Sequence, residues 1–169
     1  ADFKANNIKL YDDRTEYDLI IDKQKYKVST PILGNFNVYN TLAAITTCIL
    51  LGVSREDVIK RVQNLKSVSG RLDKVENDKK VNIIVDYAHT PDALLNILKS
   101  ARLFTKNRII LVFGCGGNRD KAKRPIMGKI AQQNADISII TSDNPRFEKE
   151  MDIIEDILCG IDKTLDNYF

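Results

Sequence analysis

The sequence has no tryptophan, one histidine and only three cysteines in 169 residues. The cysteines Cys48, Cys115 and Cys159 are odd in number and lack C-x-x-C spacing, which argues against a disulfide framework or a cysteine-based zinc site. Cysteine usage of this kind is typical of a reducing compartment, and we predict the cytoplasm. No apolar run approaches the roughly 20 residues of a membrane span, and no signal peptide is recognisable, so we expect no membrane contact.

The chain also lacks a marked excess of one charge. Its 26 Lys and Arg residues stand against 23 Asp and Glu residues, interspersed along the sequence, for a net charge of +3. This balance gives no reason to expect a nucleic-acid partner. A hydrophobic fraction of 43% with 29% charged residues is ordinary for a globular protein. Because the sequence begins at Ala1 without an initiator methionine, we expect an excised segment holding one domain and a piece of another.

One stretch combines a strand pattern with glycines and charges. The apolar run Ile109–Phe113 predicts a central strand covered on both faces, followed by the glycine-rich Gly114–Gly117 and the charged Asn118–Arg124. Because ligands of open α/β sheets bind at the carboxyl ends of strands, we expect an anionic group there. A dinucleotide fingerprint is excluded, since it needs glycine at Arg119, and no G-x-x-x-x-G-K-[ST] loop occurs. A tight turn with solvated charges is the alternative.

The first part of the chain predicts short strands and then helices. We expect strands over residues 8–11, 18–22 and 24–29, the last two forming a hairpin. Leu42, Ile45 and Ile49 have helical spacing, and Gly52 is placed to end that helix. Ser54 begins an S-x-x-[DE] pattern typical of a second helix start.

The composition of the sequence changes at residues 67–70, and this change predicts a domain boundary between residues 68 and 69. Beyond it, strand and helix patterns alternate, with Thr90 and Pro91 suited to a helix start and Pro125 to the first turn of another. This order predicts an α/β fold with a parallel sheet and right-handed crossovers. The expected strands cover residues 81–85, 109–113 and 137–140, and the last helix covers 151–161.

Polar residues follow each of these three strands. They are Asp86–His89, Gly114–Arg124 and Asp143–Arg146. Because the carboxyl ends of parallel strands open on the same edge of a sheet, we expect the three segments to face one ligand.

Two arginines at this edge are suited to carboxylates. Arg119 and Arg146 offer planar guanidinium groups, and Asp143 is able to accept hydrogen bonds from an ammonium group. Pro145 fixes its own φ and biases Asn144 away from helical backbone, which stiffens the turn. The combination suits a zwitterionic amino acid with a spare carboxylate. An ordinary turn without a ligand is the alternative.

The sequence leaves the roles of four further residues open. Asp86 is suited to a ribose, a metal or a helix cap, and His89 to a nucleotide contact or a structural role. Asn40 is either a cap or an amide donor to a purine. Arg71 is either part of an interdomain ion pair or a phosphate contact.

Five ordered motifs resemble those of one family. They are Gly34-Asn35-Phe36-Asn37-Val38-Tyr39-Asn40, Gly70-Arg71-Leu72, Asp86 to Asp92 (DYAHTPD), Val112 to Asp120 (VFGCGGNRD) and Asp143-Asn144-Pro145-Arg146. From about Ile32 to its end the chain is similar to Mur ligases, the ATP-dependent amide-forming enzymes of peptidoglycan precursor synthesis. The resemblance implies that residues 1–68 are the C-terminal part of the central ATP-binding domain. Residues 69–169 would be a Rossmann-like C-terminal domain, truncated at its end.

Within the family the motifs resemble most those of ligases that add a diamino acid to UDP-N-acetylmuramoyl-L-alanyl-D-glutamate through an acyl phosphate. The resemblance implies ATP and Mg²⁺ as cofactors, bound mainly outside this chain together with the main catalytic residues, so we expect the chain alone to be inactive. We also expect the enzyme to be a monomer.

The resemblance also assigns residue roles. It implies ATP contacts for Asn40, Arg71, Asp86 and His89, and meso-diaminopimelate contacts for Arg119 and Asp143–Arg146. Two positions depart from the family pattern: Asn118 stands where an acid is usual, and Ala122 stands where a glycine is usual.

Overall fold

The computed structural model describes residues 2–79 and 81–169, so Ala1 and Lys80 lie outside the described residues. The chain divides into two compact units, Ala1–Tyr87 and Ala88–Phe169. The domain boundary expected between residues 68 and 69 falls inside the first unit and stays a prediction. None of the helices in the described part of the chain is long and apolar enough to cross a membrane.

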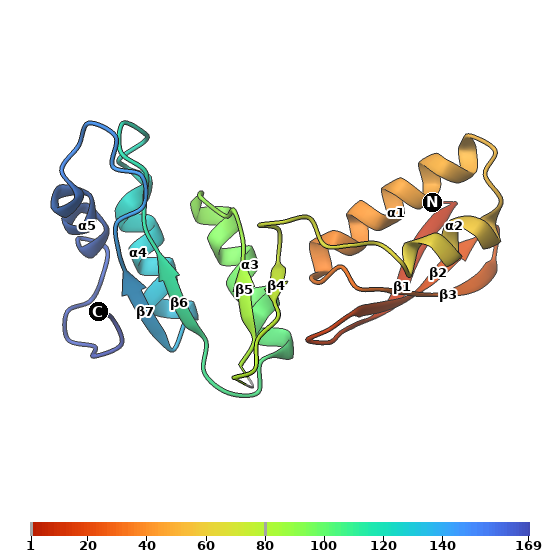
Figure 1. The fold of residues 1–169 in the computed structure, drawn as a ribbon, viewed down its shortest axis with the longest axis horizontal. Helices are drawn as coiled ribbons and strands as arrows, with labels where there is room; N and C mark the ends of the chain where they lie inside the picture. The colour runs from red at the N-terminus through yellow and green to blue at the C-terminus, as the bar shows by residue number, and fades with distance from the viewer. Residues whose placement is uncertain (1, 80) are drawn as a thin grey trace. The chain divides into compact units, whose positions relative to one another are not determined.

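The first unit contains a three-stranded antiparallel sheet with two helices against it (Figure 1). The predicted hairpin is confirmed, with Leu19 opposite Tyr26. Asp22 and Lys23 at its turn both have positive φ, of 48° and 67°, as the right-handed twist of a two-residue hairpin requires. The elements are β1 (Phe3–Leu10), β2 (Thr15–Ile21), β3 (Gln24–Thr30), α1 (Asn35–Leu50) and α2 (Arg55–Val62).

Local signals end and begin these helices as the sequence predicts. Gly52, with φ of 92°, follows the end of α1, and the side chain of Ser54 accepts a hydrogen bond from the backbone N–H of Asp57 at the start of α2. Alternate residues of β2, among them Tyr17 and Leu19, pack under the helices. The core of this unit comprises Tyr17, Leu19, Ile21, Val28, Val38, Ile45, Val58, Ile59 and Val62.

The first unit ends in a short hairpin of β4 (Asp73–Val75) and β5 (Ile83–Val85). The sequence analysis missed β4. It expected the segment of β5 to be the first of three parallel strands, whereas the ladder that β5 forms is antiparallel, with Asp73 opposite Val85. Strand β4 follows the buried Leu72 and pairs with β5, a pairing that the apolar pattern of residues 81–85 does not encode.

The second unit has parallel strands, as predicted. Strands β6 and β7 run parallel, with Ile110 opposite Ile137. The end of the chain continues this sheet, because Tyr168 forms a parallel bridge with Ser138, and the backbone N–H of Ile140 donates to the carbonyl of Phe169 at 2.8 Å. The elements are α3 (Pro91–Phe104), β6 (Ile110–Phe113), α4 (Lys123–Asn134), β7 (Ile137–Ile140) and α5 (Glu150–Leu158).

The core of the second unit lies on one side of the sheet. Helices α3, α4 and α5 all contribute to it, and the predicted start of α3 is confirmed: the Thr90 side chain accepts from the N–H of Ala93, and Pro91 is the first helical residue. On the other side, Ile110 and Val112 are 55% and 60% exposed, so the expectation of a strand covered on both faces was wrong for the described residues. The core comprises Leu94, Leu98, Ile109, Cys115, Met127, Ala135, Ile140, Ile153, Ile157 and Ile161.

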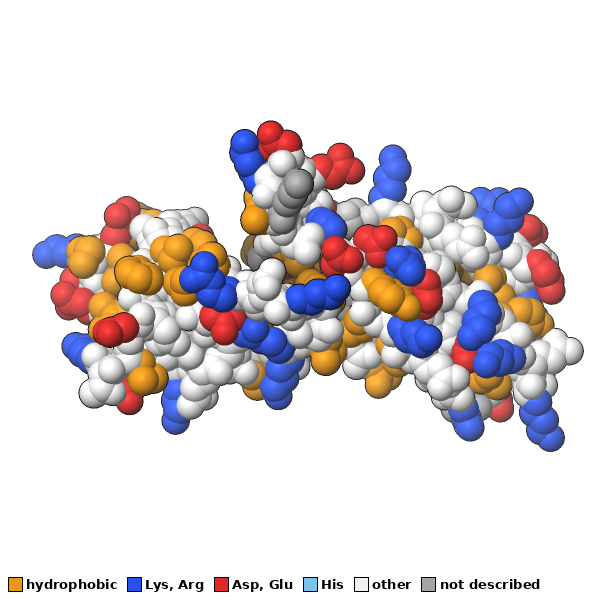
Figure 2. Space-filling view, turned by 90° about the horizontal axis from the view of Figure 1, so that it is seen from below, with side chains coloured by type: hydrophobic (Ala, Val, Ile, Leu, Met, Phe, Trp, Pro, Cys, Tyr) orange, Lys and Arg blue, Asp and Glu red, His pale blue; other side chains and the backbone are white. Residues whose placement is uncertain are grey.

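The surface is of mixed charge. Figure 2 shows acidic side chains among the lysines and arginines on the face seen there. This agrees with the small net charge and with the interspersed charges of the sequence.

Candidate functional site

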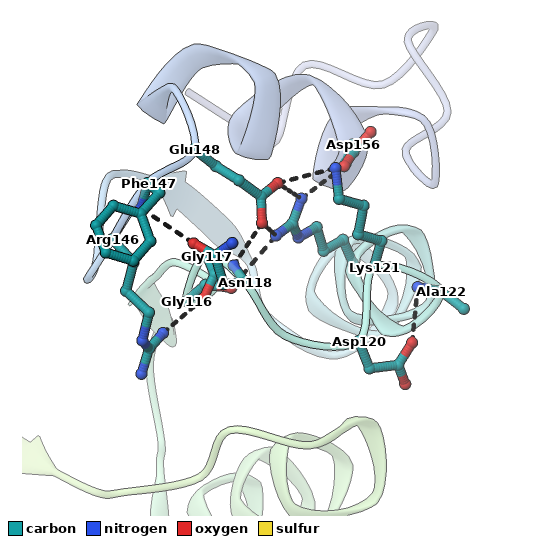
Figure 3. Close-up of polar contacts among 11 residues, drawn as sticks. Gly116, Gly117, Asn118, Asp120, Lys121, Ala122, Arg146, Phe147, Glu148 and Asp156 are labelled. Carbon is teal, nitrogen blue, oxygen red and sulfur yellow. Dashed lines mark hydrogen bonds and ion pairs between the residues drawn. The ribbon is translucent and has the colours of Figure 1, made fainter.

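Two loops of the second unit lie against each other where the parallel strands end (Figure 3). We call residues 114–122, after β6, the glycine loop, and residues 141–149, after β7, the arginine loop. The N–H of Gly117 donates to the carbonyl of Asn144 at 2.8 Å, and the N–H of Phe147 donates to Oδ1 of Asn118 at 3.0 Å. Each loop therefore donates a backbone N–H to the other, and these hydrogen bonds hold the loops together.

The glycines permit this close approach. A Cβ atom on Gly114 would lie 2.3 Å from the carbonyl oxygen of Thr141, and one on Gly117 would lie 1.9 Å from that of Pro145. Neither glycine has a positive φ, so their small size is what the structure uses here. The arginine loop of the same chain packs against this glycine-rich backbone. The anionic group expected at this edge of the sheet stays a prediction.

Arg146 is held against the glycine loop. Its Nη1 donates to the carbonyl of Gly117 at 2.7 Å, and a Cβ on Gly116 would come within 2.8 Å of the same nitrogen. Arg146 itself has φ of 52°, an unusual backbone conformation for a side chain of this size. Arg119 is exposed and directly follows Asn118, whose side chain binds the arginine loop. The two predicted recognition arginines therefore lie on loops that contact each other.

The sequence analysis missed the buried ion pair beneath these loops. The side chain of Arg124 is 0% exposed, and its guanidinium donates to both oxygens of Glu148 at 2.9 and 3.0 Å. It also donates to Asp156 on α5 at 2.8 Å and to the carbonyl of Gly116 at 3.3 Å. In the sequence, Arg124 is one of five charged residues between Asn118 and Arg124, and nothing in that run distinguishes it.

Glu148 is firmly ionised in this setting. The Arg124 guanidinium, with further hydrogen bonds from the backbone N–H of Asn118 and the Lys121 ammonium, lowers the pKa of Glu148 to about 2. The same carboxylate raises the pKa of Arg124, against the opposing effect of burial. Both groups are charged at any pH near neutrality.

In the first unit, the residues predicted to contact ATP lie on segments joined by Leu72. The side chain of Leu72 is 1% exposed and lies so near Gly34 that a Cβ there would be 2.5 Å from its Cδ1. The N–H of Leu72 donates to Oδ2 of Asp86 at 2.8 Å. The Arg71 guanidinium lies over the Tyr87 ring, 4.9 Å from its centroid. Three sequence motifs that are far apart in the chain thus meet at one residue, Leu72.

The remaining candidates are placed as follows. Asn40 is exposed on α1, and its amide nitrogen donates to Oδ1 of Asn37 at 2.8 Å. In the second unit, the carbonyl of His89 accepts a hydrogen bond from the Lys123 ammonium at 2.6 Å. Asp143 is exposed on the arginine loop.

Two further features concern possible metal ligands and the buried thiol. In residues 2–79 and 81–169, no three His, Cys, Asp or Glu side chains are grouped to hold a metal ion. Cys115 of the glycine loop is buried, and burial raises the pKa of its thiol, which disfavours the reactive thiolate.

The second unit is thus an α/β domain with arginine-bearing loops at the carboxyl ends of parallel strands, an arrangement of the ligand-binding α/β class. The sequence matches the family model of the Mur ligase glutamate ligase domain over residues 70–167 and that of the Mur ligase middle domain over residues 1–48. The chain belongs to the Mur ligase family.

Similar proteins include one from Clostridioides difficile (strain 630), named UDP-N-acetylmuramoyl-L-alanyl-D-glutamate--2,6-diaminopimelate ligase. It is 50% identical over 168 residues, which are 99% of this chain and 35% of that protein. A solved structure of a ligase of the same name has a TM-score of 0.69 at 35% identity, covering 99% of this chain and 34% of its own. A MurF ligase of Thermotoga maritima, solved with ADP, has a TM-score of 0.66 at 20% identity, covering 90% of this chain and 35% of its own, and is alike in fold. The chain spans about a third of the length of the curated relatives it matches.

Proposed function

We propose that this chain is part of an ATP-dependent ligase of the MurE type, which joins meso-diaminopimelate to UDP-N-acetylmuramoyl-L-alanyl-D-glutamate during peptidoglycan synthesis. The observation that carries the proposal is the contact between the loops of Arg119 and Arg146. The 50% identity to a ligase named for this reaction supports it. We further propose that the enzyme acts in the cytoplasm as a monomer.

The loops suit a substrate with two carboxylates and an amine. Diaminopimelate has a carboxylate and an ammonium group at each end. Guanidinium groups bind carboxylates through paired hydrogen bonds, and Asp143 supplies a negative charge for an ammonium group. Asn144 and Pro145 shape the backbone between Asp143 and Arg146. We therefore assign Arg119 and Asp143–Arg146 to amino-acid recognition.

The proposed reaction makes an amide in two steps. The γ-phosphoryl group of ATP passes to a carboxylate oxygen of the D-glutamyl residue, and ADP leaves. An amine of diaminopimelate then attacks the acyl carbon, loses a proton and releases inorganic phosphate as the C–N bond forms. ADP in the first step and phosphate in the second step are better leaving groups than hydroxide, which direct amide formation would expel.

The described residues fit ATP better than they fit a metal. Asn40 offers an exposed side-chain amide, and Arg71 and Asp86 supply a cation and a carboxylate on joined segments of the first unit. We assign these residues, and His89 of the second unit, to ATP binding. No described cluster suits Mg²⁺, so we assign no metal ligand here. When bound, Mg²⁺ neutralises phosphate charge.

The test uses the complete enzyme that contains this chain. Phosphate release is measured with ATP and the UDP-linked dipeptide, with meso-diaminopimelate or lysine as the added amino acid. We expect release to depend on the amino acid and to be faster with diaminopimelate. Preference for lysine would make the enzyme a lysine-adding ligase. Nucleotide binding without amino-acid-dependent release would favour a non-catalytic nucleotide-binding module.

Replacing Arg146 tests the assigned recognition loop. We expect Arg146→Ala to lose about 2 to 4 kcal/mol of discrimination between diaminopimelate and lysine, because a charge-assisted pair to the second carboxylate is lost. Lys149→Ala is the matched control, since it removes an exposed positive charge from the same loop. Unchanged preference in Arg146→Ala, or an equal loss in Lys149→Ala, would contradict the assignment.

A further inference from the structure

Glu148 belongs to the arginine loop and binds the glycine loop. It lies two residues after Arg146 on the arginine loop, and its Oε1 accepts a hydrogen bond from the backbone N–H of Asn118, which directly precedes Arg119. Its carboxylate also pairs with Arg124, which in turn donates to the carbonyl of Gly116. Figure 3 shows Asn118, Arg146 and Glu148 together. Arg119 directly follows Asn118, and Arg146 lies two residues before Glu148, so each proposed recognition arginine is within two residues of Glu148 or of its partner Asn118.

The buried Arg124–Glu148 ion pair is an inefficient way to stabilise the fold. The Arg124 side chain is 0% exposed and that of Glu148 is 13% exposed, so folding strips water from both charges. Apolar residues of similar volume often stabilise such a position as well or better. A buried ion pair does, however, fix direction and spacing, since a guanidinium donates its hydrogen bonds in its own plane.

We propose that Glu148, held by Arg124, is a positioning residue that sets the spacing of Arg119 and Arg146 and thereby the selectivity for a diamino-dicarboxylate over a diamino-monocarboxylate. This inference rests on the proposed function, because it concerns the same amino-acid site. Glu148 itself touches no substrate in this scheme. Its carboxylate is already bound to Arg124, Lys121 and the N–H of Asn118.

The first variant keeps the shape of the side chain and removes its charge. In the complete enzyme, Glu148→Gln should raise the KM for meso-diaminopimelate about tenfold or more while the KM for ATP stays within about twofold, because only the recognition arginines shift. The ratio of kcat/KM for diaminopimelate to that for lysine should fall by a similar factor. An unchanged ratio in a folded Glu148→Gln enzyme would overturn the inference.

A second pair of variants separates positioning from folding. Among the described residues, Glu148→Leu leaves the buried Arg124 guanidinium with Asp156 and Gly116 as its partners, and should lower both thermal stability and selectivity. The double variant Arg124→Met with Glu148→Leu removes both buried charges, and should regain stability without regaining selectivity. Recovery of selectivity together with stability would show a merely structural role and overturn the inference.

Asp156→Asn is the matched control. It removes a carboxylate that binds the same Arg124 guanidinium but belongs to α5 and not to either loop, with a side chain that is 41% exposed. Its selectivity should stay within about twofold of the unchanged enzyme. A loss equal to that of Glu148→Gln would contradict the proposal. If the unchanged enzyme shows no diaminopimelate-dependent phosphate release, the proposed function fails instead, and the two failures are distinct.

Discussion

The contact between the two loops predicts a specific sensitivity at Gly117. In Gly117→Ala, the new Cβ would lie 1.9 Å from the carbonyl oxygen of Pro145. Since an ordinary C···O contact is about 3.3 Å, the two backbones must separate by about 1.4 Å. That separation takes the N–H of Gly117 out of hydrogen-bond range of Asn144 and breaks the bond from Arg146 to the Gly117 carbonyl.

The expected loss follows from those two bonds. A backbone hydrogen bond contributes about 1 kcal/mol and one to a charged group about 1.5 to 3, so Gly117→Ala should destabilise the second unit by about 2.5 to 4 kcal/mol. Urea unfolding measures this loss of stability, and hydrogen–deuterium exchange of peptides from residues 88–169 assigns it to the second unit. In the complete enzyme the KM for diaminopimelate should rise as well, because Arg146 loses its acceptor.

Gly160→Ala is the control for this substitution. Its Cβ would lie 1.8 Å from the carbonyl oxygen of Pro125, a clash as severe as that at Gly117 but between α4 and the end of α5. It should destabilise the unit and leave the KM for diaminopimelate unchanged. A Gly117→Ala protein within about 0.5 kcal/mol of the unchanged protein would refute the reasoning. Equal effects of both variants on that KM would also refute it.

Three further predictions concern pH, the core and a helix cap. Because the folded-state pKa of Glu148 is lowered to about 2 from an ordinary 4.5, its contribution to stability should be complete above about pH 4.5. It should be lost as pH falls through 2, and urea unfolding across this range should show a weaker pH dependence in Glu148→Gln. Leu72→Ala should cost about 2 to 5 kcal/mol in the first unit, seen as faster hydrogen exchange of β4 and β5. Thr90→Ala should cost about 1 kcal/mol, measured by urea unfolding, and an unchanged midpoint would mean that the cap contributes nothing.

Features that depend on neighbouring residues were predictable from the sequence. The hairpin of β2 and β3, the end of α1 near Gly52 and the capped start of α3 at Thr90 all follow from short patterns. Strand β7 was predicted at its observed bounds, Ile137–Ile140. The motifs that resemble Mur ligases were also readable without coordinates, and the family matches over residues 1–48 and 70–167 agree with them.

Pairings between distant segments were not predictable in this way. The apolar run of β6 looks the same whether one face or both are covered, and its exposed Val112 shows that only one is covered among the described residues. The strand at residues 83–85 gives no sign that its partner is β4. The roles assigned to individual site residues, from Asn40 to Arg146, are predictions.

The sequence by itself determined the local elements and the family, because helix caps, turns and apolar periodicity act over a few residues. Only the tertiary structure decided what the glycines at 114–117 accommodate and why Arg124 is buried. Both answers come from residues 141–148, more than twenty positions away in the chain. Close backbone approach and charge pairing depend on which residues become neighbours in the folded protein, and a linear sequence pattern does not specify those neighbours.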